Sequence, residues 1–282
     1  MNMETAVRRR PFDQCWQRIE RAKTHRDAAG RAWNAFLEEE PFGTRVEIDD
    51  EGTGTIWVEQ VKPIPAVITF ELGEFLYHLR AVLDGCVYEA ACIQSGQDPP
   101  PDEDKLEFVF RSSPVRFKEA GWKLGALTDK QRNVIELMQP YNVPPDLAPR
   151  WIPFNYNRGL AMLNDWARKD RHRQLHVVAT WASNIRPILV VPKAAKLVEF
   201  VVPVQRFTLK DECQIASFRL SGWKHGMNIR ANPNLTLDMV IDESPAPCHT
   251  NDHMNTRFQC MVRGVVQVVA AMASTFGPEL FE

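Results

Sequence analysis

The sequence predicts an α+β fold: a bundle of long helices with a β-hairpin insertion and a small antiparallel sheet before the C-terminal helix. Two observations indicate this class. Apolar residues recur at helical spacing in several long segments, and β-branched, partly alternating runs occupy others. The helical core is expected at 11–39, 71–94, 128–181 and 251–276. The strand-rich insertions are expected at 45–61 and 185–242.

The composition is that of an ordinary globular protein. The 282 residues are 44% hydrophobic and 25% charged, and no internal repeat or flexible linker divides them, so we expect a single domain over 1–282. A formal net charge of -2 excludes nonspecific binding of polyanions by the whole surface, but it allows a local basic patch. No apolar run reaches the roughly 18 residues of a membrane span. We therefore expect a soluble, unprocessed, cytoplasmic protein without a membrane partner.

The first two elements are a long helix and a hairpin. Segment 11–39 places Phe12, Trp16 and Ile19 at helical spacing and starts at a proline, which suits a first helical turn. Its charged face is expected to be solvated. Two alternating runs then flank the loop 49–54, which indicates a hairpin. The Gly-x-Gly of this loop is too short and too acidic to bind phosphate, so it is interpreted as a turn.

The second helix, 71–94, is strongly apolar but carries two polar pairs whose members are four residues apart and can meet on the helix surface. These pairs are Glu74 with His78 and Arg80 with Asp84. Because the residues around them are apolar, some of these groups are expected to face protein. They are the natural partners for polar residues of the later helix that begins near 155.

The helical core continues after a proline-rich, acidic loop. Thr128 and Gln131 have the spacing of a capping box that opens a short helix. Prolines punctuate the next connection, and Asn155 or Asn157 is expected to cap a helix over 155–181. The last helix, 251–276, follows the sheet region and has a wide apolar face.

The helix predicted over 155–181 carries the most concentrated polar chemistry of the chain. Leu160, Leu163, Ala167, Val178 and Trp181 follow helical spacing along one stripe. The same stripe is interrupted by polar residues with two histidines beside them: Asp170, Arg171, Gln174, His172 and His176. Because half-buried charges are costly without partners, this segment is expected either to pair with another helix or to border a polar cleft.

One pattern in this segment resembles a known family signature. Arg171 is followed directly by a polar residue, His172, and five positions later by His176. This resembles the Arg-polar-x3-His motif of HEPN-domain proteins, a helical superfamily that includes many toxin and phage-defence ribonucleases. The resemblance implies metal-independent RNA cleavage without a cofactor. His176 would handle a proton and Arg171 would stabilise charge on the phosphate, with His172 at the polar position.

The same resemblance has consequences for assembly. Residues five apart on a helix are separated by about 7.5 Å of rise and about 140° of rotation, so a substrate would need a groove between them. HEPN-like proteins commonly build such sites at dimer interfaces, and a homodimer acting on RNA is therefore expected.

A second resemblance concerns more of the chain. The segment 73–84 followed later by Asp170-Arg171-His172-Arg173 is similar to a broad group of uncharacterised bacterial proteins that have Asp-Lys-His-Arg at the second place. This likeness implies a shared helical core but no activity. It suggests one interhelical network as a support for the site, formed by Arg80, Asp84, Asp170, His172 and Arg173, with Glu74 and His78 nearby.

Two groups of residues in the sequence have the chemistry of metal ligands. On a helix His172 and His176 would share a face, and Glu74, His78 or Asp165 would complete a site. No HExxH pattern accompanies them, so no metal is expected. Cys248, His249 and His253 also cluster, but next to residues suited to capping the last helix. The six cysteines form no CxxC pair and are interpreted as reduced thiols.

A different class of function remains open from the sequence. The strand-rich part would bind a partner, the helices would serve as a scaffold, and the cluster of arginine, histidine and aspartate would be a purely structural interhelical network.

Overall fold

The computed structural model describes residues 11–142, 156–172, 177–181, 187–202, 208–209, 212–232, 234, 236–241 and 253–277. Within these residues, six α-helices and antiparallel sheets confirm the α+β class. The chain divides into two compact units. The helical unit contains 1–28, 70–174 and 255–282, and the sheet unit contains 29–69 and 175–254. That these units together form a single domain stays a prediction.

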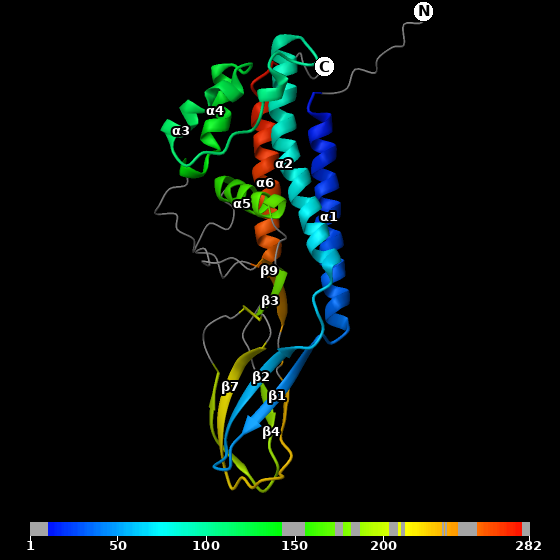
Figure 1. The fold of residues 1–282 in the computed structure, drawn as a ribbon, viewed down its shortest axis with the longest axis vertical. Coiled ribbons are helices and arrows are strands. Elements are labelled where there is room, and N and C mark those ends of the chain that lie inside the picture. Colours follow the sequence, from blue (N-terminus) through cyan, green and yellow to red (C-terminus); the bar gives the residue numbers. More distant parts are fainter. Residues whose placement is uncertain are drawn as a thin grey trace, which may run out of the picture. The chain divides into compact units, whose positions relative to one another are not determined.

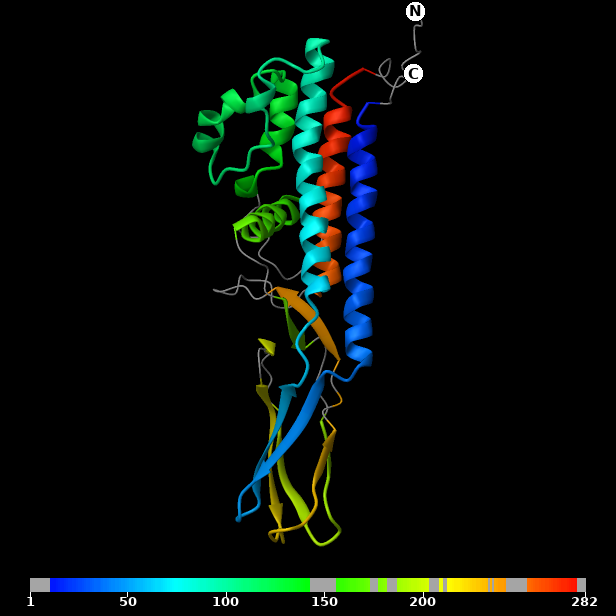
Figure 2. The same cartoon turned by 45° about the vertical axis from the view of Figure 1, so that its right-hand side comes forward.

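Three long helices form the core of the helical unit: α1 (Asp13–Glu38), α2 (Ala66–Ser95) and α6 (Met254–Ala273). They lie side by side in both views (Figures 1 and 2). Within this unit α1 runs antiparallel to α2, because the thiol of Cys15 lies 3.8 Å from the carbonyl oxygen of Val82 while His25 contacts Glu71. Helix α2 begins at Ala66, directly after a proline, five residues earlier than expected.

Apolar side chains fill the space between these helices. Phe75 of α2 meets Phe258 of α6 edge to face, with ring centroids 5.0 Å apart. Complete burial of each such side chain contributes about 1.5–3 kcal/mol relative to exposure. The fully buried residues of α2 include Leu72, Phe75, Leu76, Leu79, Val82, Leu83, Cys86 and Val87. Those of α6 include Met261, Val265, Val268, Val269 and Met272.

Short elements connect α2 to the next long helix. They are the 3-10 helices η1 (Glu103–Lys105), η2 (Gly121–Leu124) and η3 (Pro140–Asn142), with the α-helices α3 (Pro114–Glu119) and α4 (Asp129–Leu137). The predicted capping box is confirmed. The Thr128 hydroxyl accepts a hydrogen bond from the Gln131 backbone N–H, and the Gln131 side chain accepts one from the Thr128 backbone N–H.

Loss of this cap has a measurable cost. Thr128→Ala leaves a backbone N–H of the first turn of α4 without its side-chain acceptor, and we expect the free energy of unfolding to fall by about 1 kcal/mol. Urea denaturation followed by circular dichroism measures it. Thr24→Ala, at an exposed position inside α1, is the matched control and is expected to change stability by less than about 0.5 kcal/mol. Equal effects of the two variants would contradict the role of the cap.

Helix α5 (Tyr156–His172) packs closely on α6 through two glycines. A Cβ atom added to Gly159 would lie 2.3 Å from the carbonyl oxygen of Cys260, and one added to Gly264 would lie 2.9 Å from that of Tyr156. Only glycine therefore fits at this crossing. Asn157 lies within α5 and donates to the carbonyl oxygens of Leu137 and Gln139, whereas Asn155 lies outside the described residues.

The prediction of one helix over 155–181 is wrong for its last part. Helix α5 ends at His172, and strand β3 (Val177–Trp181) follows after four residues outside the described part. Strand β3 pairs antiparallel with β9 (Leu237–Ile241), from Val177 opposite Ile241 to Trp181 opposite Leu237. The β-branched residues of β3 suit this extended pairing, which outweighs an apolar spacing that also fits a helix.

The predicted hairpin and the predicted sheet belong to one structure in the sheet unit. The hairpin is β1 (Phe42–Ile48) with β2 (Thr53–Gln60), and β2 also pairs antiparallel with β7 (Glu212–Ser221). Strand β5 (Lys196–Val201) completes the order β1-β2-β7-β5. The described residues also form the orders β6-β3-β9 and β4-β8, with β4 (Ile188–Val190), β6 (Thr208–Leu209) and β8 (Arg230–Asn232).

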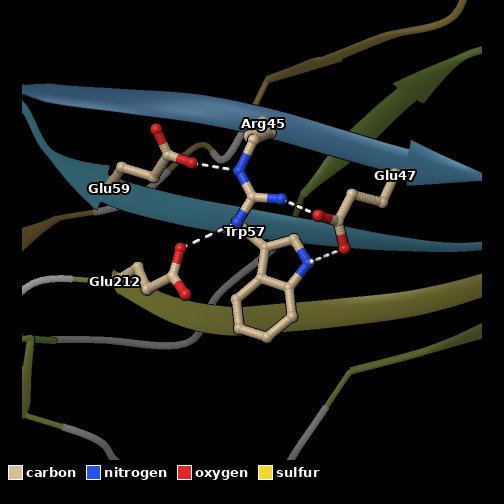
Figure 3. A network of polar contacts seen from close by, with 5 residues as sticks. All are labelled: Arg45, Glu47, Trp57, Glu59 and Glu212. Atoms are coloured by element: carbon tan, nitrogen blue, oxygen red, sulfur yellow. Dashed lines mark hydrogen bonds and ion pairs between the residues drawn. The ribbon is translucent and has the colours of Figure 1, made fainter.

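An exposed polar network links three strands of this sheet (Figure 3). The guanidinium of Arg45 on β1 bonds the carboxylates of Glu47, Glu59 and Glu212, the last at 2.7 Å, and lies 5.4 Å from the ring centroid of Trp57. These carboxylates raise the pKa of Arg45. The network spans β1, β2 and β7 and so favours the observed register.

Candidate functional site

A cavity of about 820 Å³ opens in the helical unit between α1, α2 and α5. Its volume lies within the range of about 300–1,000 Å³ that is common for small-molecule pockets. Several ionisable groups line it: Asp13, Arg18, Arg80, Asp84, Glu89, Asp98, Asp170 and Arg171. Four of the residues expected to form the site therefore share one cavity, namely Arg80, Asp84, Asp170 and Arg171.

The last turn of α5 brings Asp170 and Arg171 to this cavity. The Nε of Arg171 donates to the carbonyl oxygen of Ala167 at 3.3 Å, one turn earlier, and the rest of the side chain is exposed. The carboxylate of Asp170 packs on Gly73 of α2, where an added Cβ would lie 3.0 Å from Oδ2. Burial, with a smaller contribution from Glu74, raises the pKa of Asp170.

Arg80 and Asp84 form a half-buried connection between α2 and the segment 106–111. The Nη2 of Arg80 donates to Asp84 Oδ1 at 3.1 Å and to the carbonyl oxygen of Phe108 at 2.7 Å, while Phe108 N–H donates to Asp84 Oδ1 at 2.9 Å. The guanidinium lies 4.9 Å from the ring centroid of Phe110. Within the described part of the chain, Nε and Nη1 of Arg80 are buried without a hydrogen-bond acceptor.

The electrostatics of this pair reflect its burial. Desolvation lowers the pKa of Arg80 and raises the pKa of Asp84, and their mutual attraction offsets part of both changes. Arg171 also lowers both pKa values, which places its charge within electrostatic reach of the pair. The guanidinium groups of Arg80 and Arg171 therefore both line the cavity, and both interact electrostatically with the carboxylate of Asp84.

The remaining predicted site residues lie elsewhere or outside the described part. His172 is exposed at the end of α5 and does not line the cavity. Arg173 and His176 lie outside the described residues. The expected helical separation of Arg171 and His176, and the expected shared helical face of His172 and His176, both involve a residue outside the described part of the chain and stay predictions.

Glu74 and His78 belong to a second cluster on the same pair of helices. His25 Nδ1 lies 2.7 Å from Glu71 Oε2, and the ring of His25 stacks on that of His78 with centroids 5.3 Å apart. His78 Nε2 lies 4.0 Å from Glu74 Oε2. Sequence reasoning missed His25, which sits on a helix face expected to be solvated. The signal was an imidazole on the same helix face as Arg18 and Arg21, seven and four residues earlier.

The described cysteines are free thiols. Burial raises the pKa of Cys15 to about 12 and raises that of Cys86 well above its usual value. A nucleophilic cysteine needs a lowered pKa, so neither thiol is suited to covalent catalysis. Cys248 and His249 lie outside the described residues, and His253 lies 3.4 Å from Asp238 in an ion pair.

Comparisons with protein-family models, curated proteins and solved structures found no match to this chain. In the described part of the chain, no helix combines the length and apolar character that crossing a bilayer requires.

Proposed function

We propose that this chain is a HEPN-like, metal-independent endoribonuclease that uses Arg171 and His176, with His172 at the polar position of the motif. The observation that supports the proposal is the position of Arg171, which lines a cavity of about 820 Å³ within electrostatic reach of Arg80. A guanidinium binds two phosphate oxygens through parallel hydrogen bonds, and a phosphodiester with its sugars fits a space of this size.

The reaction needs a charge stabiliser and a proton carrier. The ribose 2′-oxygen attacks the neighbouring phosphorus, and the bond from phosphorus to the 5′-oxygen breaks. The proton of the 2′-hydroxyl passes to a base, and the leaving 5′-oxygen takes up a proton. Arg171 stabilises the negative charge that develops on the phosphate, and His176, whose imidazole titrates near neutral pH, carries one of the protons.

The charges around Arg171 restrict how RNA binds. Acidic groups outnumber arginines on the cavity wall, and Asp170 lies next to Arg171. Long-range attraction of a polyanion by this surface is therefore weak, which agrees with the net charge of -2. RNA accordingly contacts the protein over a short stretch, at one phosphodiester. A second copy of the chain completes the site in a homodimer. We place this homodimer in the cytoplasm, with a role in toxicity or phage defence.

A non-catalytic scaffold is the second candidate, and one observation favours it. The partly buried hydrogen bonds among Arg80, Asp84 and Phe108 already explain why two of the polar residues are present, without any substrate. In this alternative Arg171 and His176 have no catalytic role, and the protein acts by binding a partner.

RNA cleavage in the presence of EDTA separates the two functions. We expect the wild-type protein to cut a fluorescently labelled RNA and to leave the same sequence in 2′-deoxy form intact. Arg171→Ala and His176→Ala are each expected to lower the cleavage rate by about 100-fold or more. Circular dichroism and the melting temperature establish that the variants are folded.

Matched variants control for general effects. Arg168→Ala removes an exposed arginine of the same helix, which is paired with Asp165 at 3.3 Å, and His225→Ala removes an exposed histidine of the sheet unit. Both are expected to cleave RNA at the wild-type rate. Absence of cleavage by the wild type, or equal rates in Arg171→Ala and Arg168→Ala, would reject the ribonuclease and leave the scaffold.

A further inference from the structure

Three potential metal ligands meet where α1 and α2 pack in the helical unit. One ligand atom each from His25, Glu74 and His78 lies within 4.8 Å of the other two. Among the residues that the structure describes, this is the group of three or more histidine, cysteine or carboxylate side chains that is close enough to surround one ion. His25 and His78 are partly buried and Glu74 is exposed, so solvent reaches the group from the side of Glu74.

Glu71 orients His25 as an outer carboxylate orients a metal-binding histidine. His25 Nδ1 lies 2.7 Å from Glu71 Oε2, with both side chains largely shielded, so the proton of the neutral ring is placed on Nδ1. The lone pair is then on Nε2, which is left for an ion. Metal-bound histidines commonly use their other ring nitrogen in this way.

His78 lacks ordinary hydrogen bonds in its surroundings. Its Nδ1 is buried without a partner among the described residues, and the nearest described carboxylate oxygen is 4.0 Å from Nε2, beyond hydrogen-bond distance. A polar ring in such a place costs free energy unless something else satisfies it.

The charges facing these rings come from two helices. Arg18 and Arg21 of α1 oppose a cation near His78, but both are exposed and screened by solvent. Glu71 and Glu74 of α2 favour a cation, and each approaches an imidazole to 4.0 Å or less. Asp170 of α5 adds negative charge near Glu74.

We propose that His25, Glu74 and His78 bind one divalent transition-metal ion of the Zn²⁺ class. Two imidazoles and one carboxylate suit Zn²⁺, Co²⁺ or Ni²⁺, whereas Mg²⁺ and Ca²⁺ prefer oxygen ligands alone. An opening of about 570 Å³ reaches His78, and Asp13, Arg18 and Arg21 of α1 also line it. The ion joins α1 to α2 and keeps a fourth position for water.

Small side-chain movements complete the site. Zinc to nitrogen bonds are about 2.0–2.1 Å, so the ligand atoms must come closer together than 4.8 Å. The two rings stack with an interplanar angle of 16°, and one ring must turn about its Cβ–Cγ bond for both lone pairs to meet at one point. The exposed carboxylate of Glu74 is free to swing toward them.

Calorimetry with ZnCl₂ and absorption spectra with CoCl₂, on the 282-residue chain first stripped with EDTA, test the proposal without RNA. We expect one equivalent per chain, a tetrahedral Co²⁺ spectrum, and a rise in Tm of about 5 °C at a zinc concentration 100 times Kd. His25→Ala and His78→Ala are each expected to weaken binding by about 100-fold, and Glu71→Gln by about 10-fold.

Two further variants control for loss of the fold and for zinc binding at other histidines. Glu74→Gln changes an exposed side chain, so it leaves the fold intact and is expected to weaken binding by about 10-fold or more. His225→Ala removes an exposed histidine outside the cluster and is expected to bind zinc as the wild type does. No stoichiometric binding by the wild type, or unchanged binding by Glu74→Gln and His78→Ala, would overturn the site.

Discussion

Replacing Arg80 with alanine is expected to lower the free energy of unfolding by about 2 kcal/mol, because the change leaves the half-exposed carboxylate of Asp84 without its cation and the carbonyl oxygen of Phe108 without its donor. The arginine also bonds the carbonyl oxygen of Phe108 at 2.7 Å and covers the ring of Phe110, so segment 106–111 keeps only part of its attachment to α2, through the bond from Phe108 N–H to Asp84. Urea denaturation followed by circular dichroism measures the loss.

A double variant separates the charge from the packing. In Arg80→Met with Asp84→Leu, neither partner is left as an unpaired ion, and we expect it to be more stable than Arg80→Ala alone. Arg168→Ala, which breaks an exposed ion pair with Asp165, is expected to cost less than about 1 kcal/mol. A loss below about 1 kcal/mol for Arg80→Ala would mean that this pair contributes little to the fold.

Periodicity within one segment predicted the helices of this chain well, and the sequence also located a specific cap. The bounds expected for the first and last helices differ from α1 and α6 by only a few residues. Thr128 and Gln131 were predicted from spacing alone because a capping box depends on residues three apart. Such features are local, so residues close in sequence are sufficient to predict them.

Features that depend on distant segments could not be predicted in this way. Val178 and Trp181 have the spacing of one face of a helix. They nevertheless lie in a strand, because they pair with β9, about sixty residues later in the sequence. The pairing of β2 with β7 joins segments separated by more than 150 residues, and hydrophobic periodicity within either segment does not indicate its partner.

The candidate site shows the same division. The sequence placed Arg80, Asp84, Asp170 and Arg171 together because their polarity contrasts with apolar neighbours, and they do line one cavity. It did not predict that Arg80 and Asp84 bond the backbone of Phe108, nor that His25 stacks on His78. Those contacts follow from the register between packed segments, which composition and spacing within each segment leave undefined.

Gly159→Ala is the second change with a large expected effect. The new Cβ would lie 2.3 Å from the carbonyl oxygen and 2.6 Å from the carbonyl carbon of Cys260, both in the backbone of α6. A helix backbone cannot yield by rotating a side chain, so α5 must move away from α6 and lose packing around Leu160 and Leu163. We expect the free energy of unfolding to fall by about 3 kcal/mol.

Gly30→Ala is the matched control for this crossing. Gly30 lies inside α1, and an added Cβ there meets no atom within 4 Å, so alanine is expected to raise stability by up to about 1 kcal/mol through its helix propensity. The two substitutions are chemically identical and differ in sign only because of the contact at α6. Because α5 also carries Arg171 to the cavity, Gly159→Ala is expected to slow RNA cleavage under conditions in which it remains folded, whereas Gly30→Ala leaves the rate unchanged. Equal stability of the two variants would mean that α5 and α6 do not pack at Gly159, and the position assigned to Arg171 would then lose its support.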